Sequence, residues 1–180
     1  RLLTDDALSY SSLAFTADGA ELLAAVDEIE SERRDLRTPL VALAIDGSGR
    51  REVLGRDAGL SVNDVFVAPD GAVAILGADV GESAVDFVAP GVALWLVEDA
   101  GPRRLTDAEA IDLGEGGSHI DADGDDFLVQ DRTRGRLRLL RVTRAGDVAE
   151  VLGGDVEVNG HATANGRTVA SLTTADSFGE

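Results

Sequence analysis

Short apolar runs alternate with glycine-containing turns along the whole chain. In four places an apolar run is followed by a turn of small and acidic or amide residues, and then by a second apolar run. Asp-Gly and Asn-Gly pairs favour tight turns because these residues tolerate positive φ, so each place predicts a β-hairpin. The four turn sequences are Thr16-Ala17-Asp18-Gly19, Ala68-Pro69-Asp70-Gly71, Asp121-Ala122-Asp123-Gly124 and Thr163-Ala164-Asn165-Gly166.

The spacing of these hairpins predicts the fold class. The last glycines of successive turns lie 52, 53 and 42 residues apart, which is typical of β-propeller blades and not of helical solenoids. Further apolar runs follow the first three hairpins, at 40–45, 92–97 and 137–142, and a fourth strand follows each of them, at 52–54, 103–106 and 149–152. Four antiparallel strands per unit make a propeller blade. We therefore expect an all-β fold, an incomplete β-propeller of about three full four-stranded antiparallel blades plus parts of two more.

The phase of the repeat sets the expected boundaries within this one propeller domain. The segment 1–4 resembles 103–106, so 1–6 is expected to be the last strand of a preceding blade. Complete blades are expected at 7–57, 58–110 and 111–155, and the first half of a further blade at 156–180. Because open sheet edges favour pairing with other chains, we expect the chain, taken alone, to associate into homo-oligomers.

Composition narrows the classes of partner. The 180 residues include 34 acidic and 16 basic residues, a formal charge of −18, and every basic residue is Arg. This charge repels nucleic acid and anionic membranes, so neither is an expected partner. It fits either a solvated acidic surface or an acidic site for cationic ligands. The absence of Cys excludes disulfides and thiolate metal sites and fits a cytoplasmic location, and no apolar run has the length of a membrane span.

Several motifs resemble one known family. The turn Ala68-Pro69-Asp70-Gly71, the strand Leu94-Trp95-Leu96-Val97 and the segment 102–107 resemble the propeller of the prolyl oligopeptidase family. The segments 129–142 and 150–154 look like its acylaminoacyl-peptidase branch. The resemblance implies that the propeller covers a C-terminal α/β-hydrolase domain with a Ser/Asp/His triad, which this chain does not contain. It also implies a filter that limits entry of long or folded peptide substrates.

Other functions remain open at this stage. A non-enzymatic, TolB-like propeller that binds a protein partner has the same blade pattern. A carbohydrate- or metal-dependent propeller enzyme is a third alternative, although no dedicated acid/base pair stands out. No Gly-x-Ser-x-Gly elbow is present: the glycines beside Ser48 are directly adjacent to it, and Ser118 has Gly116 before it but Ile120 after it. We therefore expect no catalytic residue and no cofactor in this chain, and any serine peptidase activity to belong to the parent protein.

Two histidines occupy equivalent places in the repeat. His119 and His161 each precede the last glycine of their turn by five residues. Equivalent positions on successive first strands face the same way, so the two imidazoles are expected to line one wall of the channel. The alternative is a structural pair, hydrogen-bonded between blades. A metal site would need a third ligand, and none is expected.

Two charged segments invite a functional interpretation. An EF-hand loop beginning at Asp121 would need Gly at its sixth position and Glu at its twelfth, where the chain has Asp126 and Arg132. This acidic segment is therefore interpreted as a hairpin turn. The even spacing of four arginines predicts guanidinium groups on one strand face, where they either pair with neighbouring carboxylates or dock against an acidic surface such as another domain. These arginines are Arg132, Arg134, Arg136 and Arg138.

Overall fold

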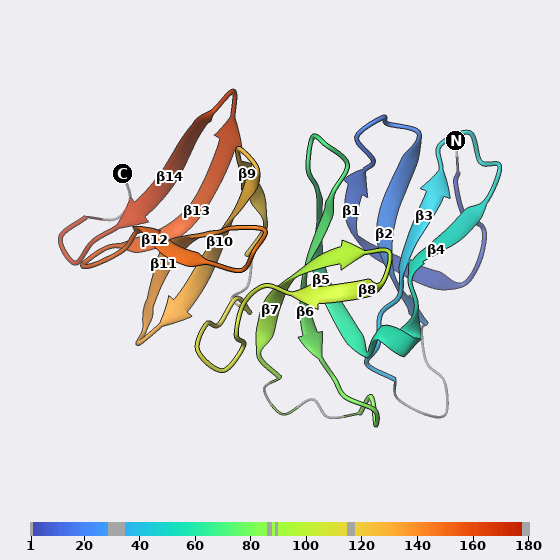
Figure 1. Ribbon diagram of the computed structural model, residues 1–180, viewed down its shortest axis with the longest axis horizontal. Helices are drawn as coiled ribbons and strands as arrows, with labels where there is room; N and C mark the ends of the chain where they lie inside the picture. The colour runs from blue at the N-terminus through green and yellow to red at the C-terminus, as the bar shows by residue number, and fades with distance from the viewer. Residues whose placement is uncertain (1, 29–34, 86–87, 89, 115–117, 178–180) are drawn as a thin grey trace. The chain divides into compact units, whose positions relative to one another are not determined.

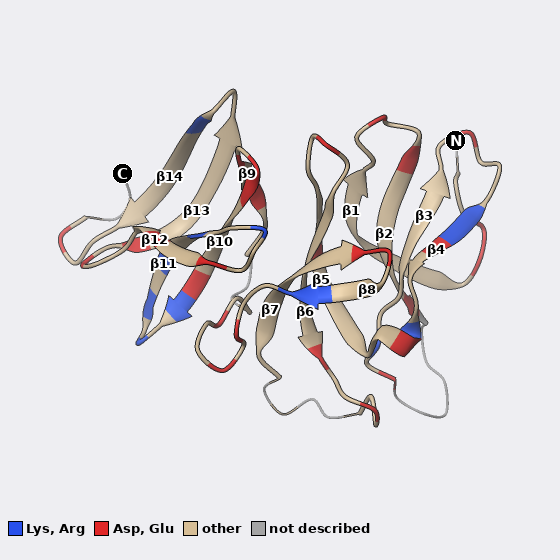
Figure 2. Cartoon of the chain, viewed as in Figure 1, with Lys and Arg blue, Asp and Glu red and all other residues tan. Residues whose placement is uncertain are grey.

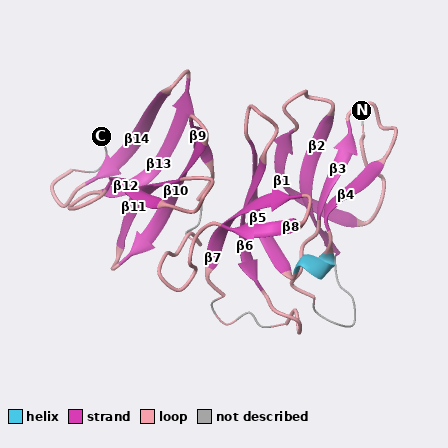
Figure 3. Ribbon diagram, in the orientation of Figure 1, coloured by secondary structure: helices cyan, strands magenta, loops and turns pink. Residues whose placement is uncertain are grey.

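The computed structural model describes residues 2–28, 35–85, 88, 90–114 and 118–177. These residues form fourteen strands and one short 3-10 helix, Arg56–Ala58 (Figure 3). The strands make three four-stranded sheets and one two-stranded hairpin, and in every sheet the strands are paired in chain order. A four-stranded meander is the unit of a β-propeller. The expected fold class, a partial propeller with three complete blades, is therefore confirmed.

The chain divides into two compact units, which are described separately. The first comprises Arg1–Pro90 with Trp95–Arg103, and the second comprises Gly91–Leu94 with Arg104–Glu180. The strands of the first two blades are β1 Leu8–Phe15, β2 Glu21–Glu28, β3 Leu40–Ala44, β4 Arg50–Leu54, β5 Leu60–Val67, β6 Val73–Asp79, β7 Val92–Glu98 and β8 Gly101–Arg104 (Figure 1).

The second unit contains the third blade and a two-stranded half-blade. In Figure 1 the half-blade is the red hairpin whose tip points upward, and it lies beside the orange strands of the third blade. The strands are β9 Asp121–Asp123, β10 Asp126–Thr133, β11 Arg136–Val142, β12 Val148–Leu152, β13 Glu157–Ala164 and β14 Arg167–Thr173.

All four recurring turns connect the first and second strands of a sheet. Their glycines have positive φ, from 65° at Gly124 to 89° at Gly71, a conformation that a residue with a side chain rarely adopts. In the β13–β14 hairpin both turn residues have positive φ, 52° at Asn165 and 68° at Gly166. Two consecutive positive φ values are those of a type I′ turn, whose twist suits paired strands. The Asp/Asn-Gly signature is therefore explained by backbone geometry.

The first residues differ from the expectation. Residues 2–7 form no strand in the structure, although a strand over 1–6 was expected; Arg1 lies outside the described residues. A strand is held by hydrogen bonds to a neighbour, and no described strand pairs with this segment. Similarity between the first residues and β8 is therefore not sufficient to form a strand without a partner.

Each unit has its own apolar core. In the first unit, β2 and β3 contribute a cluster of Ala24, Val26, Val41 and Leu43. In the second unit, Leu128 and Leu139 of the third blade pack against Val158 of the half-blade. Burial of such a Leu or Val side chain stabilises the folded state by about 1.5–3 kcal/mol. Apolar packing therefore joins the third blade to the half-blade.

A buried hydrogen bond also joins these two blades. Gln130 Nε2 on β10 donates to the carbonyl oxygen of Val158 on β13 over 2.7 Å, and both residues are buried. A shift of β13 would break this bond and leave the Gln130 amide buried without a partner, which costs free energy. The bond therefore favours one position of β13 against the third blade. This bond and the apolar packing together hold β13 at a defined position beside the third blade, whose first strand is β9.

Charged residues lie mainly on turns, loops and exposed strand faces. Figure 2 shows acidic residues distributed over both units, and arginines concentrated on β10 and β11 within the second. The described residues contain no helix with the length and hydrophobicity needed to cross a membrane.

Candidate functional site: a His-Asp-His cluster

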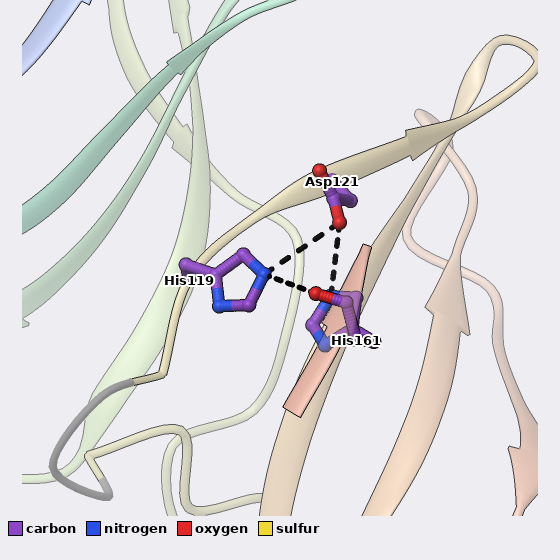
Figure 4. Close-up of side chains that lie close together, drawn as sticks. All are labelled: His119, Asp121 and His161. Carbon is purple, nitrogen blue, oxygen red and sulfur yellow. Dashed lines mark hydrogen bonds and ion pairs between the residues drawn. The ribbon is translucent and has the colours of Figure 1, made fainter. Parts of the chain in front are cut away.

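The two histidines singled out by the repeat are in contact. Their rings stack with centroids 4.2 Å apart and planes 11° from parallel. His119 lies on the segment that leads into β9, and His161 lies on β13, where it pairs with Ala170 of β14 (Figure 4). His119 Nε2 donates a hydrogen bond to the carbonyl oxygen of His161 over 2.8 Å. The contact joins the third blade to the half-blade.

Asp121 completes the cluster. Its Oδ2 atom lies 3.6 Å from His119 Nε2 and 3.8 Å from His161 Nε2. One ligand atom from each of the three residues lies within 4.8 Å of the other two. Asp121 is the first residue of β9, whereas His161 lies on β13, the first strand of the half-blade. The cluster therefore depends on the packing of β9 beside β13.

Burial differs sharply within the cluster. The His161 side chain is fully buried, whereas the His119 side chain is 39% exposed. No hydrogen bond of normal distance and angle joins either ring nitrogen of His161, or Asp121 Oδ2, to a described residue, although the Leu128 backbone lies close enough to His161 to act on its pKa. Buried polar atoms are nearly always paired, so three unpaired ones at one place need an explanation.

The environment favours a neutral His161. Burial lowers the pKa of His161, and the neighbouring His119 lowers it further, whereas Asp121 and the Leu128 backbone oppose the shift. Desolvation disfavours the charged imidazolium, and a second imidazole nearby does the same when it is protonated. A neutral imidazole has a lone pair on one ring nitrogen and binds metal ions or accepts a proton.

The sequence does not single out Asp121 as a partner of the histidines. It places this residue in a hairpin turn, yet the turn residues are Gly124 and Asp125, and Asp121 pairs with Leu128 as a strand residue. One signal was available: residues two apart on an extended strand share a face, so Asp121 lies on the side of His119. Whether the pair lines a channel, as the sequence predicts, stays a prediction.

The four arginines of the basic segment do not share one strand face. Arg134 and Gly135 both have positive φ, 50° and 77°, and form the turn between β10 and β11. Arg132 therefore lies on β10 and opposes Leu137, whereas Arg136 and Arg138 lie on β11. The prediction that all four lie on one strand is wrong, because Arg134 and Gly135 form a tight turn that reverses the chain between Arg132 and Arg136.

Three of these arginines bind carboxylates of the same unit. Arg132 contacts Asp112 over 2.7 Å and Arg136 contacts Asp155 over 2.7 Å. Arg138 binds Asp131 and Glu150, at 2.6 and 3.1 Å. These pairs satisfy much of the hydrogen-bonding capacity of the guanidinium groups.

A hollow lies beside the arginines of this hairpin. It has a volume of about 490 Å³ and is lined by Arg134, Arg136, Arg138, Glu150 and Gly153, among others. Arg134 makes no ion pair with a described residue, and its side chain is exposed in the turn. Docking of an acidic surface here stays a prediction, for which Arg134 is the available cation.

The fold and the blade order define a class, the β-propellers whose blades are four-stranded meanders. No protein-family model and no curated protein sequence matches the chain. Solved structures do match. One is a prolyl endopeptidase, studied for the role of inter-domain dynamics in catalysis and specificity, with a TM-score of 0.65 and 14% identity over 94% of this chain and 25% of that chain.

Two further structures are similar. Dipeptidyl peptidase 4 of Porphyromonas gingivalis matches with a TM-score of 0.53 and 11% identity, over 93% of this chain and 30% of that one. A putative TolB from Agrobacterium tumefaciens matches with a TM-score of 0.41 and 16% identity, over 99% and 75% of the two chains. The chain thus spans about a third or less of the length of the prolyl endopeptidase and of dipeptidyl peptidase 4, and it has a fold that occurs in both.

Proposed function

We propose that this chain is the substrate-gating propeller of a cytoplasmic serine peptidase that resembles the acylaminoacyl peptidases. Hydrolysis of peptides would take place in an α/β-hydrolase domain outside these residues. The observation that carries the proposal is the coincidence of family-like motifs with a peptidase-like propeller fold. Fold alone does not specify function, so the motifs are needed as a second line of support.

The family-like motifs occupy defined places in the second blade. The turn 68–71 joins β5 to β6, and Leu94-Trp95-Leu96-Val97 lies within β7. The segment 102–107 begins in β8 and continues through Leu105 and Thr106. Thr106 is buried, and its hydroxyl accepts a hydrogen bond from the Leu94 amide over 2.9 Å. The residues of the second blade that resemble the family therefore form its first turn and its last two strands, and the family-like segments 129–142 and 150–154 lie in the third blade, which supports a shared blade construction.

Covalent labelling of the full-length protein tests this function. A fluorophosphonate probe reacts with serines that a triad activates, and mass spectrometry of the digested protein locates the labelled residue. We expect one labelled serine outside residues 1–180, with labelling prevented by a short peptide substrate. Heat-denatured protein is the control, because a serine that needs a folded triad should lose its reactivity.

The opposite result is equally clear. If the folded full-length protein contains no serine that reacts with the probe, the peptidase function is wrong. Stable binding of a folded protein partner by such an inert protein would instead support the TolB-like alternative, a propeller that mediates protein–protein interaction.

A further inference from the structure

We propose that His119, Asp121 and His161 form a binding site for a divalent transition-metal ion, such as Zn²⁺, that ties the third blade to the half-blade. The proposal does not depend on the peptidase function. It rests on the type of the three side chains, their distances and the unpaired buried atoms of two of them.

The donor set suits a borderline cation. Two imidazoles and one carboxylate are common zinc ligands, and a site with three protein ligands leaves a fourth position for water. Bonds of about 2.05 Å in a tetrahedral site place ligand atoms about 3.4 Å apart. Oδ2 of Asp121 lies 3.6 and 3.8 Å from the two Nε2 atoms, so a small contraction is sufficient.

The unpaired atoms are the second and independent observation. His161 is only 7% exposed, yet neither of its ring nitrogens makes a hydrogen bond of normal distance and angle with a described residue, the nearby Leu128 backbone included. Asp121 Oδ2 is also buried and unpaired, and it faces both rings (Figure 4). A cation bound between these atoms would satisfy a carboxylate oxygen and one nitrogen of His161 together. No described side chain does so.

Binding would require a limited rearrangement of His119. The rings stack nearly in parallel, so their lone pairs do not yet converge on one point. His119 Nε2 would also have to give up its hydrogen bond to the His161 carbonyl and carry its proton on Nδ1. His119 precedes β9 and is partly exposed, so its ring is the one with room to turn. The metal would replace the stacked contact with two coordinate bonds.

The partners come from two blades, which gives the site a role. His119 and Asp121 belong to the third blade, and His161 belongs to β13 of the half-blade. A ligand that binds only the folded arrangement stabilises it by mass action. The metal would therefore strengthen the junction between these blades, in addition to the apolar packing of Leu128, Leu139 and Val158.

Calorimetric titration of the full chain with Zn²⁺, after removal of bound metal by a chelator, tests the proposal. We expect one strong site per chain and a rise in Tm on addition of Zn²⁺. Co²⁺ in its place should give the visible absorption of a tetrahedral site with nitrogen and oxygen ligands. His119→Ala and Asp121→Asn should each weaken binding by about tenfold or more, because each removes a direct ligand and loss of even an outer-shell partner has an effect of that size.

The variants distinguish metal binding at this site from nonspecific binding to the many surface carboxylates. His119 is partly exposed, so its substitution should leave the chain folded even where a substitution of buried His161 does not. Asp125→Asn is the matched control, because it removes one carboxylate from the exposed turn of the same hairpin and should leave affinity unchanged. Equal binding by wild type, His119→Ala and Asp121→Asn, or no binding at all, would overturn the proposal.

Discussion

At the scale of single residues, Asp35 has an unusually strong set of partners for an acid on a surface loop. Its carboxylate binds the Arg37 guanidinium over 2.9 Å and the Arg56 guanidinium over 2.8 Å. Hydrogen bonds from Arg37 hold the pKa of Asp35 well below its usual range, with burial opposing the shift and Arg56 adding to it. The charged form of Asp35 is therefore favoured in the folded state.

This arrangement predicts a contribution to acid stability. A carboxyl whose pKa is lowered on folding stabilises the protein fully above its unfolded pKa of about 3.9, and the contribution is lost as pH falls toward the folded pKa. Asp35→Asn should lower the free energy of unfolding at pH 7 by about 1 kcal/mol or less, because the group is partly exposed. Urea unfolding at pH 7 and pH 3 measures the difference.

A second variant checks the assigned cause. Arg37→Gln removes the largest contribution to the shift, so it should reproduce most of the loss at pH 7 and, like Asp35→Asn, have a smaller effect at pH 3. An effect of Asp35→Asn that is the same at both pH values would mean that the ion pairs do not carry it.

The sequence predicts part of the candidate site at this scale. Equal spacing from the turn glycines identifies His119 and His161 as related residues, and the structure brings them into contact. Asp121 is not predicted, because its position in an acidic run suggests only a solvated turn. The contact depends on how closely β13 packs against the third blade, which pattern and spacing do not report.

At the scale of elements, the β10–β11 hairpin is organised around the buried carboxylate of Asp131. The Asp131 side chain is 1% exposed, accepts a hydrogen bond from the Asp112 amide over 2.8 Å and binds Arg138 over 2.6 Å. The two residues oppose each other in the antiparallel register. The carboxylate therefore ties both strands to the segment that precedes the third blade.

Loss of this carboxylate should be costly. Asp131→Ala should lower the free energy of unfolding by about 1–3 kcal/mol, because it leaves the Asp112 amide without its acceptor and removes a charged hydrogen bond to Arg138, which is partly exposed and still binds Glu150. Asp155→Ala is the control: its ion pair with Arg136 is almost fully solvated, and such pairs contribute between about 0 and 1 kcal/mol. Equal losses for the two variants, measured by urea unfolding, would contradict the structural assignment.

The same hairpin shows why element boundaries are hard to predict. Even spacing from Arg132 to Arg138 has the period of a strand, and the pattern alone favours one continuous face. Gly135 is the only residue in that run that signals a turn, and the preceding Arg134 is an uncommon residue for positive φ. By contrast, the four recurring turns were predictable because Gly is preceded or followed by Asp or Asn in each.

At the scale of the whole chain, a repeat of four short strands was sufficient to predict a propeller, because each blade has the same sequence of apolar runs and turns. The described residues contain three complete blades and a half-blade. Residues 2–7 form no strand, because strand formation there depends on a partner and not on local sequence alone, so the assignment of 1–6 to a preceding blade stays a prediction. Function is harder to predict from this sequence than the fold, because gating would be a property of the propeller together with another domain.

Length discrimination by the full-length protein tests the proposed gating function most directly. The measurement is kcat/KM for a short peptide relative to the same cleavage sequence within a folded protein, in wild type and in Gln130→Ala, which lacks the hydrogen bond to the Val158 carbonyl. We predict that wild type favours the short peptide by about 100-fold, equivalent to about 2.7 kcal/mol in transition-state stabilisation. Gln130→Ala should reduce this preference and leave cleavage of the short peptide unchanged. Equal cleavage of the two substrates by wild type would contradict a gating propeller.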